Sequence, residues 1–127
     1  MKNVLSILLV ALVMCSCSNS AQECDGVEAS HILTMAKTPE EFKAAEDTAK
    51  VILAKLEKGE SFEDLALQYG SDGTKSKGGH LGWFTRGAMV QPFEDSCFSV
   101  AVNQPTIVTT QFGVHVINVN EKSTPCK

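Results

Sequence analysis

The stretch Gly78–Phe98, which reads GGHLGWFTRGAMVQPFEDSCF, decides how this chain folds. Two glycine turns, at Gly79 and Gly87, lie on either side of a short apolar run that is typical of a half-buried strand. Glycine lets the backbone bend tightly at both turns. We therefore expect several of the large apolar side chains of this stretch to gather around one concave spot; the stretch carries Leu81, Trp83, Phe84, Met89, Phe93 and Phe98.

The rest of the chain predicts an alternation of helices and strands. A long helix begins at Thr38, which can cap it, with Pro39 in the first helical position and Glu41 completing a capping box. Gly59 ends that helix. We expect further helices over 61–69 and Val90–Phe98, and strands over Glu28–Leu33, Leu81–Phe84, Thr106–Thr109 and Val114–Glu121. This order predicts a single α+β domain over residues 27–122, with helices packed around an antiparallel sheet.

The first twenty residues have the layout of a secretory signal peptide: Lys2, the apolar run Val4–Met14, then small polar residues. The run is shorter than the roughly 20 residues that a membrane span needs. Residues 14–17 weakly resemble a bacterial lipobox that ends at Cys17. We expect an exported protein that is secreted, periplasmic or in the secretory pathway, and a lipoprotein attached to the membrane through Cys17 remains the alternative.

Charge and motif spacing exclude several classes of function. The chain has 11 basic and 15 acidic residues and no basic stripe, which argues against nucleic acid as a partner. Its three histidines are not spaced like zinc ligands, so we expect no metal. Lys77, Gly78 and Gly79 lack the rest of a phosphate-binding loop. We expect no cofactor.

Three motifs in order, Ser30–Leu33, Gly78–Phe98 and Thr109–Val119 (TTQFGVHVINV), resemble the parvulin family of peptidyl-prolyl cis/trans isomerases. The resemblance runs from Ala29 to Asn120 and implies a four-stranded antiparallel sheet with the long helix on one side. It also implies that the first and last strands are neighbours at the centre of the sheet. The function implied is isomerisation of Xaa-Pro bonds in exported or unfolded polypeptides. Proline-containing segments are then the partners, and we expect a monomer.

The reaction needs no bond to be broken. The two isomers of an Xaa-Pro bond lie within about 1 kcal/mol of each other, but a barrier of ~18–20 kcal/mol separates them. A catalyst therefore needs an apolar slot for the proline ring and groups that favour the twisted carbonyl.

The resemblance assigns Met89 and Phe93 to the walls of a proline pocket, Leu81 to its edge and Phe112 to a turn above it. Spacing alone favours ordinary core residues, and it is the resemblance that favours the pocket assignment for Met89 and Phe93; we expect Phe98 to be a core residue. His31 and His115 match paired histidines below the site that share hydrogen bonds with each other and with a threonine, Thr110 here.

Asp72 matches the position at which parvulins carry cysteine or aspartate near the substrate carbonyl. From the residues alone, His31 and His115 could be core residues and Asp72 a loop residue. With aspartate at this position a thiolate mechanism cannot apply, and electrostatic influence on the twisting bond is the expectation.

The chain departs from the family pattern in three places. His80 replaces an acidic residue, and we expect it to be exposed. Val90 stands where many members carry a glutamine. Residues 34–38 offer Lys37 alone in place of an arginine cluster, which argues against a phosphate-directed preference.

Cys24, Cys97 and Cys126 lie outside the leader. Because the family places the first and last strands side by side, the resemblance implies a Cys24–Cys126 disulfide. We expect Cys97 to be a small buried residue.

Two other functions remain open. A chaperone of parvulin fold could hold unfolded or proline-containing segments with little turnover. A disulfide-stapled interaction domain without a preference for proline is the third possibility.

Overall fold

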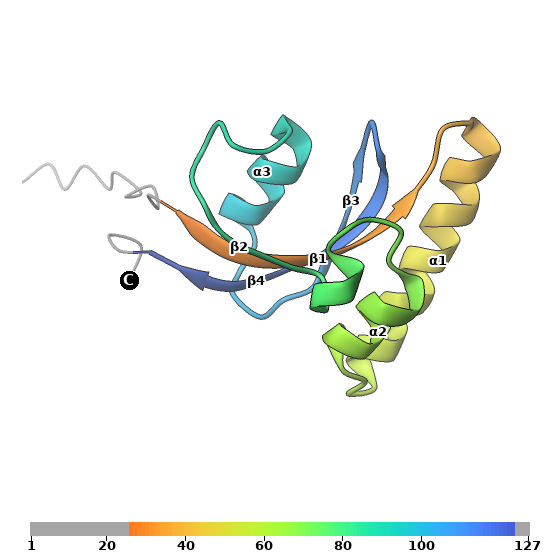
Figure 1. Cartoon of the computed structure of the whole chain (residues 1–127), viewed down its shortest axis with the longest axis horizontal. Helices are drawn as coiled ribbons and strands as arrows, with labels where there is room; N and C mark the ends of the chain where they lie inside the picture. Colours follow the sequence, from red (N-terminus) through yellow and green to blue (C-terminus); the bar gives the residue numbers. More distant parts are fainter. Residues whose placement is uncertain (1–25, 124–127) are drawn as a thin grey trace, which may run out of the picture.

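The structure is a computed structural model that describes residues 26–123. Its elements follow the predicted order (Figure 1): β1 Val27–Met35, α1 Pro39–Glu57, α2 Phe62–Tyr69, a 3-10 turn η1 Lys75–Lys77, β2 His80–Phe84, α3 Gln91–Ser99, β3 Thr106–Thr110 and β4 Gly113–Lys122. The expected strands and helices are all present, and their ends differ from the prediction by at most two residues. These small shifts arise because pairing with a neighbouring strand extends a strand beyond its own apolar pattern.

All four strands are antiparallel, in the order β2-β1-β4-β3. The first and last strands are therefore central neighbours, as the family resemblance implied. They pair from Val27 opposite Lys122 to Met35 opposite Gly113. Both central strands are buried along most of their length because helices cover both faces of the sheet.

Alternation along β1 divides the core into two layers. Ile32 points to the face covered by α1 and α2, where it packs with Ala49, Ile52 and Leu65. Val27 and Ala29 point to the other face, which α3 covers (Figure 1). The odd-numbered residues of β1, including His31 and Leu33, therefore face α3.

The start of α1 forms as its sequence predicts. The Thr38 side chain accepts a hydrogen bond from the Glu41 N–H, and the Glu41 carboxylate accepts one from the Thr38 N–H. Two unpaired N–H groups of the first turn are satisfied in this way. The buried face of α1 includes Ala45, Ala49 and Ile52, three of the positions that its helical spacing indicates.

Trp83 does not pack in the core with Phe84, and 51% of its surface is exposed, as suits the outer side of a half-buried strand. It pairs opposite Glu28, whose side chain is on the other face of the sheet from Val27 and Ala29. Only Phe84, of the two neighbouring aromatic residues, packs in the core under α3.

Several predictions fall on residues outside the described range. The leader 1–20, Cys17 and the Cys24–Cys126 pair all do so. Among residues 26–123 no helix has the length and apolar character that crossing a membrane requires.

Gly79 joins the loop after α2 to the central strand. Its carbonyl accepts a hydrogen bond of 2.8 Å from the His31 N–H, and its φ of +82° lies in the left-handed region. A Cβ there would clash with the His31 carbonyl oxygen.

We predict that Gly79→Ala lowers the free energy of unfolding by about 2 kcal/mol or more, through strain and this backbone clash. Urea denaturation measures the change. Gly73→Ala is the matched control, because open space surrounds that position and its φ is not left-handed. Equal stability losses in the two variants would contradict the role of the close approach.

Candidate active site

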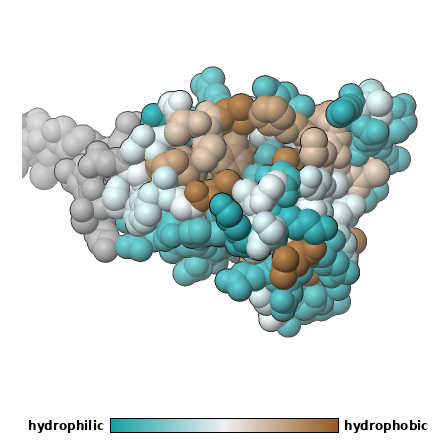
Figure 2. All heavy atoms as spheres, in the orientation of Figure 1, coloured by the Kyte–Doolittle hydropathy of each residue, from teal (hydrophilic) through white to brown (hydrophobic). Residues whose placement is uncertain are grey.

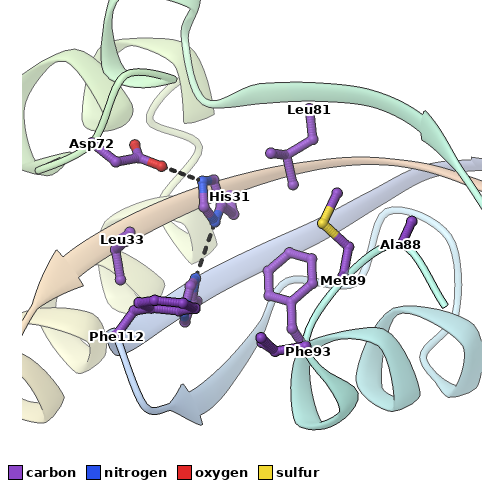
Figure 3. A pocket seen from close by; sticks show the side chains of 10 residues that line it. His31, Leu33, Asp72, Leu81, Ala88, Met89, Phe93 and Phe112 are labelled. Carbon is purple, nitrogen blue, oxygen red and sulfur yellow. Dashed lines mark hydrogen bonds and ion pairs between the residues drawn. The ribbon is translucent and has the colours of Figure 1, made fainter.

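A pocket of about 310 Å³ opens on the α3 face of the sheet. Figure 2 shows apolar residues gathered on this side of the molecule, over α3 and the loop that leads into it. The side chains around the pocket come from β1, β2, β4, α3 and three loops (Figure 3), and they are His31, Leu33, Asp72, Leu81, Ala88, Met89, Val90, Phe93, Phe112 and His115.

The structure brings together every site residue that the sequence predicted within the described range. Seven of the eight line the pocket, and the eighth, Thr110, lies beside it and bonds to His115. The sequence did not predict Leu33 and Ala88 as lining residues. Leu33 could have been found, because it lies two residues after His31 on the same face of the strand.

A β-bulge directs Leu81 into the pocket. The register of β2 against β1 passes from Gly82 opposite Ala29 to His80 opposite Ser30, so Leu81 has no partner. An extra residue of this kind bends the strand and re-aims a side chain. Gly82 adopts a φ of +78° at this point, which glycine accommodates without strain.

The wall opposite Leu81 is formed by Met89 and Phe93. Phe93 is both a core residue and a pocket residue, because only 3% of its surface is exposed yet its ring lines the cavity. The ring stands edge-on to both imidazoles, with centroids 5.6 Å from His31 and 5.2 Å from His115. Its position is therefore fixed from below, while Met89 is only partly buried and free to adapt.

The floor of the pocket is a continuous chain of hydrogen bonds. His31 Nε2 lies 2.9 Å from an oxygen of Asp72, and His31 Nδ1 lies 3.0 Å from His115 Nδ1. His115 Nε2 lies 2.8 Å from Thr110 Oγ1, which also accepts a 3.2 Å hydrogen bond from the Phe112 N–H. Figure 3 shows the Asp72–His31 link as a dashed line.

This chain allows one consistent set of proton positions for two neutral histidines. An ionised carboxylate can only accept, so His31 Nε2 donates to Asp72 and His31 Nδ1 is left as an acceptor. His115 Nδ1 then donates to His31, and His115 Nε2 accepts from the Thr110 hydroxyl. Every side-chain polar atom in this series of hydrogen bonds has a partner, so burying the two imidazoles costs little free energy.

Burial keeps both histidines neutral. It lowers the pKa of His115 to about 4, with a further lowering from His31 and an opposing effect of Asp72. Burial also lowers the pKa of His31, although the charge and hydrogen bond of Asp72 work against it. Partial burial would raise the pKa of Asp72, but hydrogen bonds from Thr74 and the contacts of His31 outweigh it and leave that pKa below its ordinary value.

The loop that carries Asp72 is fastened to β1. The Ser71 N–H donates to the Leu33 carbonyl at 2.9 Å, and the second Asp72 oxygen accepts from the Thr74 hydroxyl at 2.7 Å. These bonds hold the carboxylate over His31 even though it lies on a loop. The Asp72–His31 contact itself could not be read from the sequence, because the two residues are 41 positions apart.

Glu94 is a further residue that sequence reasoning missed. It sits in the first turn of α3, is buried, and accepts a 2.7 Å hydrogen bond from the Gly87 N–H. Gly87 has a φ of +91° in the loop just before Met89. The carboxylate thus closes the loop that presents the Met89 wall of the pocket. Glutamate is common in the exposed first turn of a helix, so the sequence around Glu94 did not indicate that its side chain is buried.

Three further side chains lie as predicted: Phe98 in the core, Cys97 buried and His80 exposed. Phe98 packs outside the pocket with the Arg86 guanidinium 4.4 Å above its ring, and Cys97 is fully buried. Burial raises the pKa of the Cys97 thiol to about 12. His80 is exposed and lies 3.3 Å from a Glu28 oxygen.

Within residues 26–123 no cluster of three or more His, Cys, Asp or Glu has the geometry to hold a metal ion.

A family model described as the PPIC-type peptidyl-prolyl isomerase (PPIase) domain matches residues 12–123. The chain belongs to this family. The foldase protein PrsA of Geobacillus kaustophilus is 42% identical to this chain over 98 residues, which cover 76% of this chain and 32% of that protein. The chain thus spans about a third of the length of this curated relative.

Two solved structures share the fold of this PPIC-type domain. The crystal structure of PrsA from Bacillus subtilis aligns with a TM-score of 0.65 and 39% identity, over 76% of this chain and 35% of that one. The solution structure of NmPin, the parvulin of Nitrosopumilus maritimus, aligns with a TM-score of 0.62 and 35% identity, over 75% of this chain and 95% of that one. The predicted parvulin family and α+β fold are confirmed.

The buried histidines make the stability of the PPIC-type domain depend on pH. A histidine whose folded-state pKa is lowered contributes its full stability above the unfolded value of 6.5 and loses it as pH falls toward the folded value, about 4 for His115. The lowered pKa of Asp72 acts in the same direction at still lower pH.

We predict that the free energy of unfolding is level near pH 7–8 and falls by about 3 kcal/mol between pH 6.5 and 4. Urea denaturation across this range measures it. His115→Asn keeps a hydrogen-bond donor toward His31 but cannot titrate. The free energy of unfolding of this variant should therefore depend less steeply on pH, even if the variant is less stable than the unaltered protein. His80→Asn, at an exposed position, should keep the slope. An unchanged slope in His115→Asn would contradict the assignment.

Proposed function

We propose that this domain accelerates cis/trans isomerisation of Xaa-Pro bonds by binding the twisted amide without forming a covalent bond. The observation that carries the proposal is the apolar cup of Leu81, Met89 and Phe93 directly beside the His31–His115 floor. Met89 and Phe93 offer a flat, adaptable surface to a proline ring. Family membership supports the same activity.

The residues around the cup favour a mechanism without a nucleophile. Cys97, the one cysteine between residues 26 and 123, is fully buried outside the pocket, and burial raises its pKa to about 12. A thiol in that state does not attack substrate. Rate enhancement then comes from holding the ring in the cup and the flanking chain in a twisted geometry, which is differential binding of the transition state.

The polar chain has a positioning role in this proposal. Asp72 and His31 both line the pocket and so can act electrostatically on the amide as its resonance is lost. His115 and Thr110 orient His31 from below through the hydrogen bonds described above. Because isomerisation breaks no covalent bond, no proton transfer is required of either histidine.

The charge of the pocket supports a substrate that is not phosphorylated. None of the described residues that line it is lysine or arginine, and Asp72 adds a negative charge. A phosphate before the proline would be repelled there and would find no cationic partner. Proline-containing segments of unfolded polypeptides are therefore the proposed substrates, with broad tolerance for the residue before proline.

We also propose that the protein is exported and works as a monomer. The signal-like residues 1–20 support export, and attachment through Cys17 remains the alternative to a secreted form. Exported polypeptides with slow proline steps are suitable clients, since uncatalysed isomerisation takes tens of seconds or longer.

A chaperone that binds such segments with little turnover is the second candidate. Val90 favours it, because this apolar residue lines the pocket where a hydrogen-bonding side chain could otherwise hold the substrate. Both candidates bind proline-containing segments, but only the isomerase increases the rate of cis/trans exchange.

Isomerisation of a short Xaa-Pro peptide, followed by exchange NMR, tests the proposal because it reports binding and rate together. We predict that Met89→Ala and Phe93→Leu each lower kcat/KM per folded molecule about tenfold, since each removes part of the cup. Phe93→Ala is less informative. Only 3% of the Phe93 surface is exposed, so removing its ring leaves a cavity in the core and lowers the free energy of unfolding by about 3–5 kcal/mol.

Phe98→Leu is the matched control, because Phe98 lies in the same core cluster but outside the pocket. It should lower stability and leave activity per folded molecule unchanged. Binding without acceleration by the unaltered protein would favour the chaperone, and equal activity losses in Phe93→Leu and Phe98→Leu would overturn the pocket assignment.

The Cys24–Cys126 disulfide is a separate proposal, supported by the central pairing of β1 with β4, whose outer ends lie near residues 24 and 126 in the sequence. Mass spectrometry of non-reduced peptides should find this pair linked, and reduction should lower the free energy of unfolding by roughly 4–5 kcal/mol in the chain-entropy model. A free thiol at Cys24 would refute the link.

A further inference from the structure

Two large apolar side chains next to the pocket are exposed. Met35, at the end of β1, has 50% of its surface exposed, and Phe112, in the turn between β3 and β4, has 49%. Of the exposed large apolar residues in the described range, only Phe112 lines the pocket itself; Met35 does not, and neither do Val51, Leu67, Trp83 and Val102.

Strand geometry places Met35 on the pocket side of the sheet. Alternate residues of β1 face the same way, so Met35 shares a face with His31 and Leu33, both of which line the pocket. Met35 pairs opposite Gly113, which has no side chain to cover it. The Ala36 N–H donates to the Phe112 carbonyl at 3.1 Å, which holds the Phe112 turn against this end of β1.

Leu33, Phe112 and Met35 thus form an apolar shelf that continues the pocket along β1. Figure 3 shows Leu33 and Phe112 on the side of His31 away from Leu81, Met89 and Ala88. The shelf contains no charged side chain. Exposed apolar surface that is continuous with a binding pocket is a usual sign of an interaction site.

We propose that this shelf is a second substrate subsite, which binds an apolar side chain of the same polypeptide whose proline occupies the cup. This inference rests on the proposed substrate class. A strand advances about 3.3 Å per residue, so Leu33 and Met35 lie roughly 7 Å and 13 Å along β1 from His31. In this proposal the substrate is extended and runs along β1, advancing at about the same rate, so the shelf holds a leucine-like or aromatic side chain roughly two to four residues from the proline.

Peptide affinity and turnover test the subsite together. Three peptides share a central Ala-Pro: one carries leucines two to four residues before it, one carries them after it, and one has serines on both sides. Their affinities are measured by NMR titration, and their isomerisation rates by exchange NMR. We expect one of the leucine peptides to bind about three- to tenfold more tightly than the serine peptide, as removal of a partly exposed apolar side chain from water implies.

Met35→Gln is the decisive variant, because glutamine keeps the length of methionine and the backbone contacts of the strand but not its apolar character. It should reduce the preference for leucine flanks to less than twofold. Leu67→Gln is the matched control: Leu67 is 51% exposed on α2 and lines no part of the pocket, so the preference should persist.

The outcomes separate this inference from the proposed function. Equal affinities for the three peptides, or a preference that survives Met35→Gln, would overturn the shelf whatever the turnover. Preferential binding that depends on Met35 but brings no acceleration would support the shelf and count against the isomerase. If sedimentation shows a dimer that Met35→Gln dissociates, the shelf is covered by a second copy and the subsite is wrong.

Discussion

The antiparallel pairing of β1 with β4 is the constraint on which the whole site depends. Its register sets Leu33 opposite His115 and His31 opposite Ile117, so the two histidines are diagonal neighbours on one face of the sheet. Side chains on a strand alternate with a period of two, and a slip of one residue would move an imidazole to the opposite face. Ile32, Val114 and Val116, packed against the helices on that opposite face, oppose such a slip.

The polar chain below the pocket combines burial with full hydrogen bonding. Isolated polar groups are costly to bury, and the His31–His115 pair would be unfavourable if either ring lacked a partner. Asp72 at one end and Thr110 at the other give each ring nitrogen a partner. The Phe93 ring packs edge-on against both imidazoles, so the apolar wall and the polar floor support each other. The geometry of the pocket and the packing of the core therefore depend on the same side chains.

Side chains from the loops reach the pocket because hydrogen bonds tie those loops to the sheet or to α3. Ser71 fastens the Asp72 loop to β1, and Glu94 fastens the Met89 loop to α3. Such bonds leave little freedom at the base of the cup, while Met89 and Phe112 at its rim remain partly exposed. A firm floor with an adaptable rim suits a site that accepts many sequences around a single proline.

Local features of the sequence determined the elements. The capping box at Thr38, the helical stop at Gly59 and the glycine turns around Leu81 act through neighbouring residues, so their effect is visible in sequence order. The cup residues could also be named, because the motif that contains Met89 and Phe93 resembles that of a known family. Only the tertiary structure decided three contacts: Asp72 on His31 and Met35 beside Phe112, which join distant segments, and the shorter-range contact of Glu94 with the Met89 loop. The physical reason is that these contacts depend on strand register, on a β-bulge and on loop closure. Each of these is set by packing across the whole domain, and none by the residues next to it in the chain.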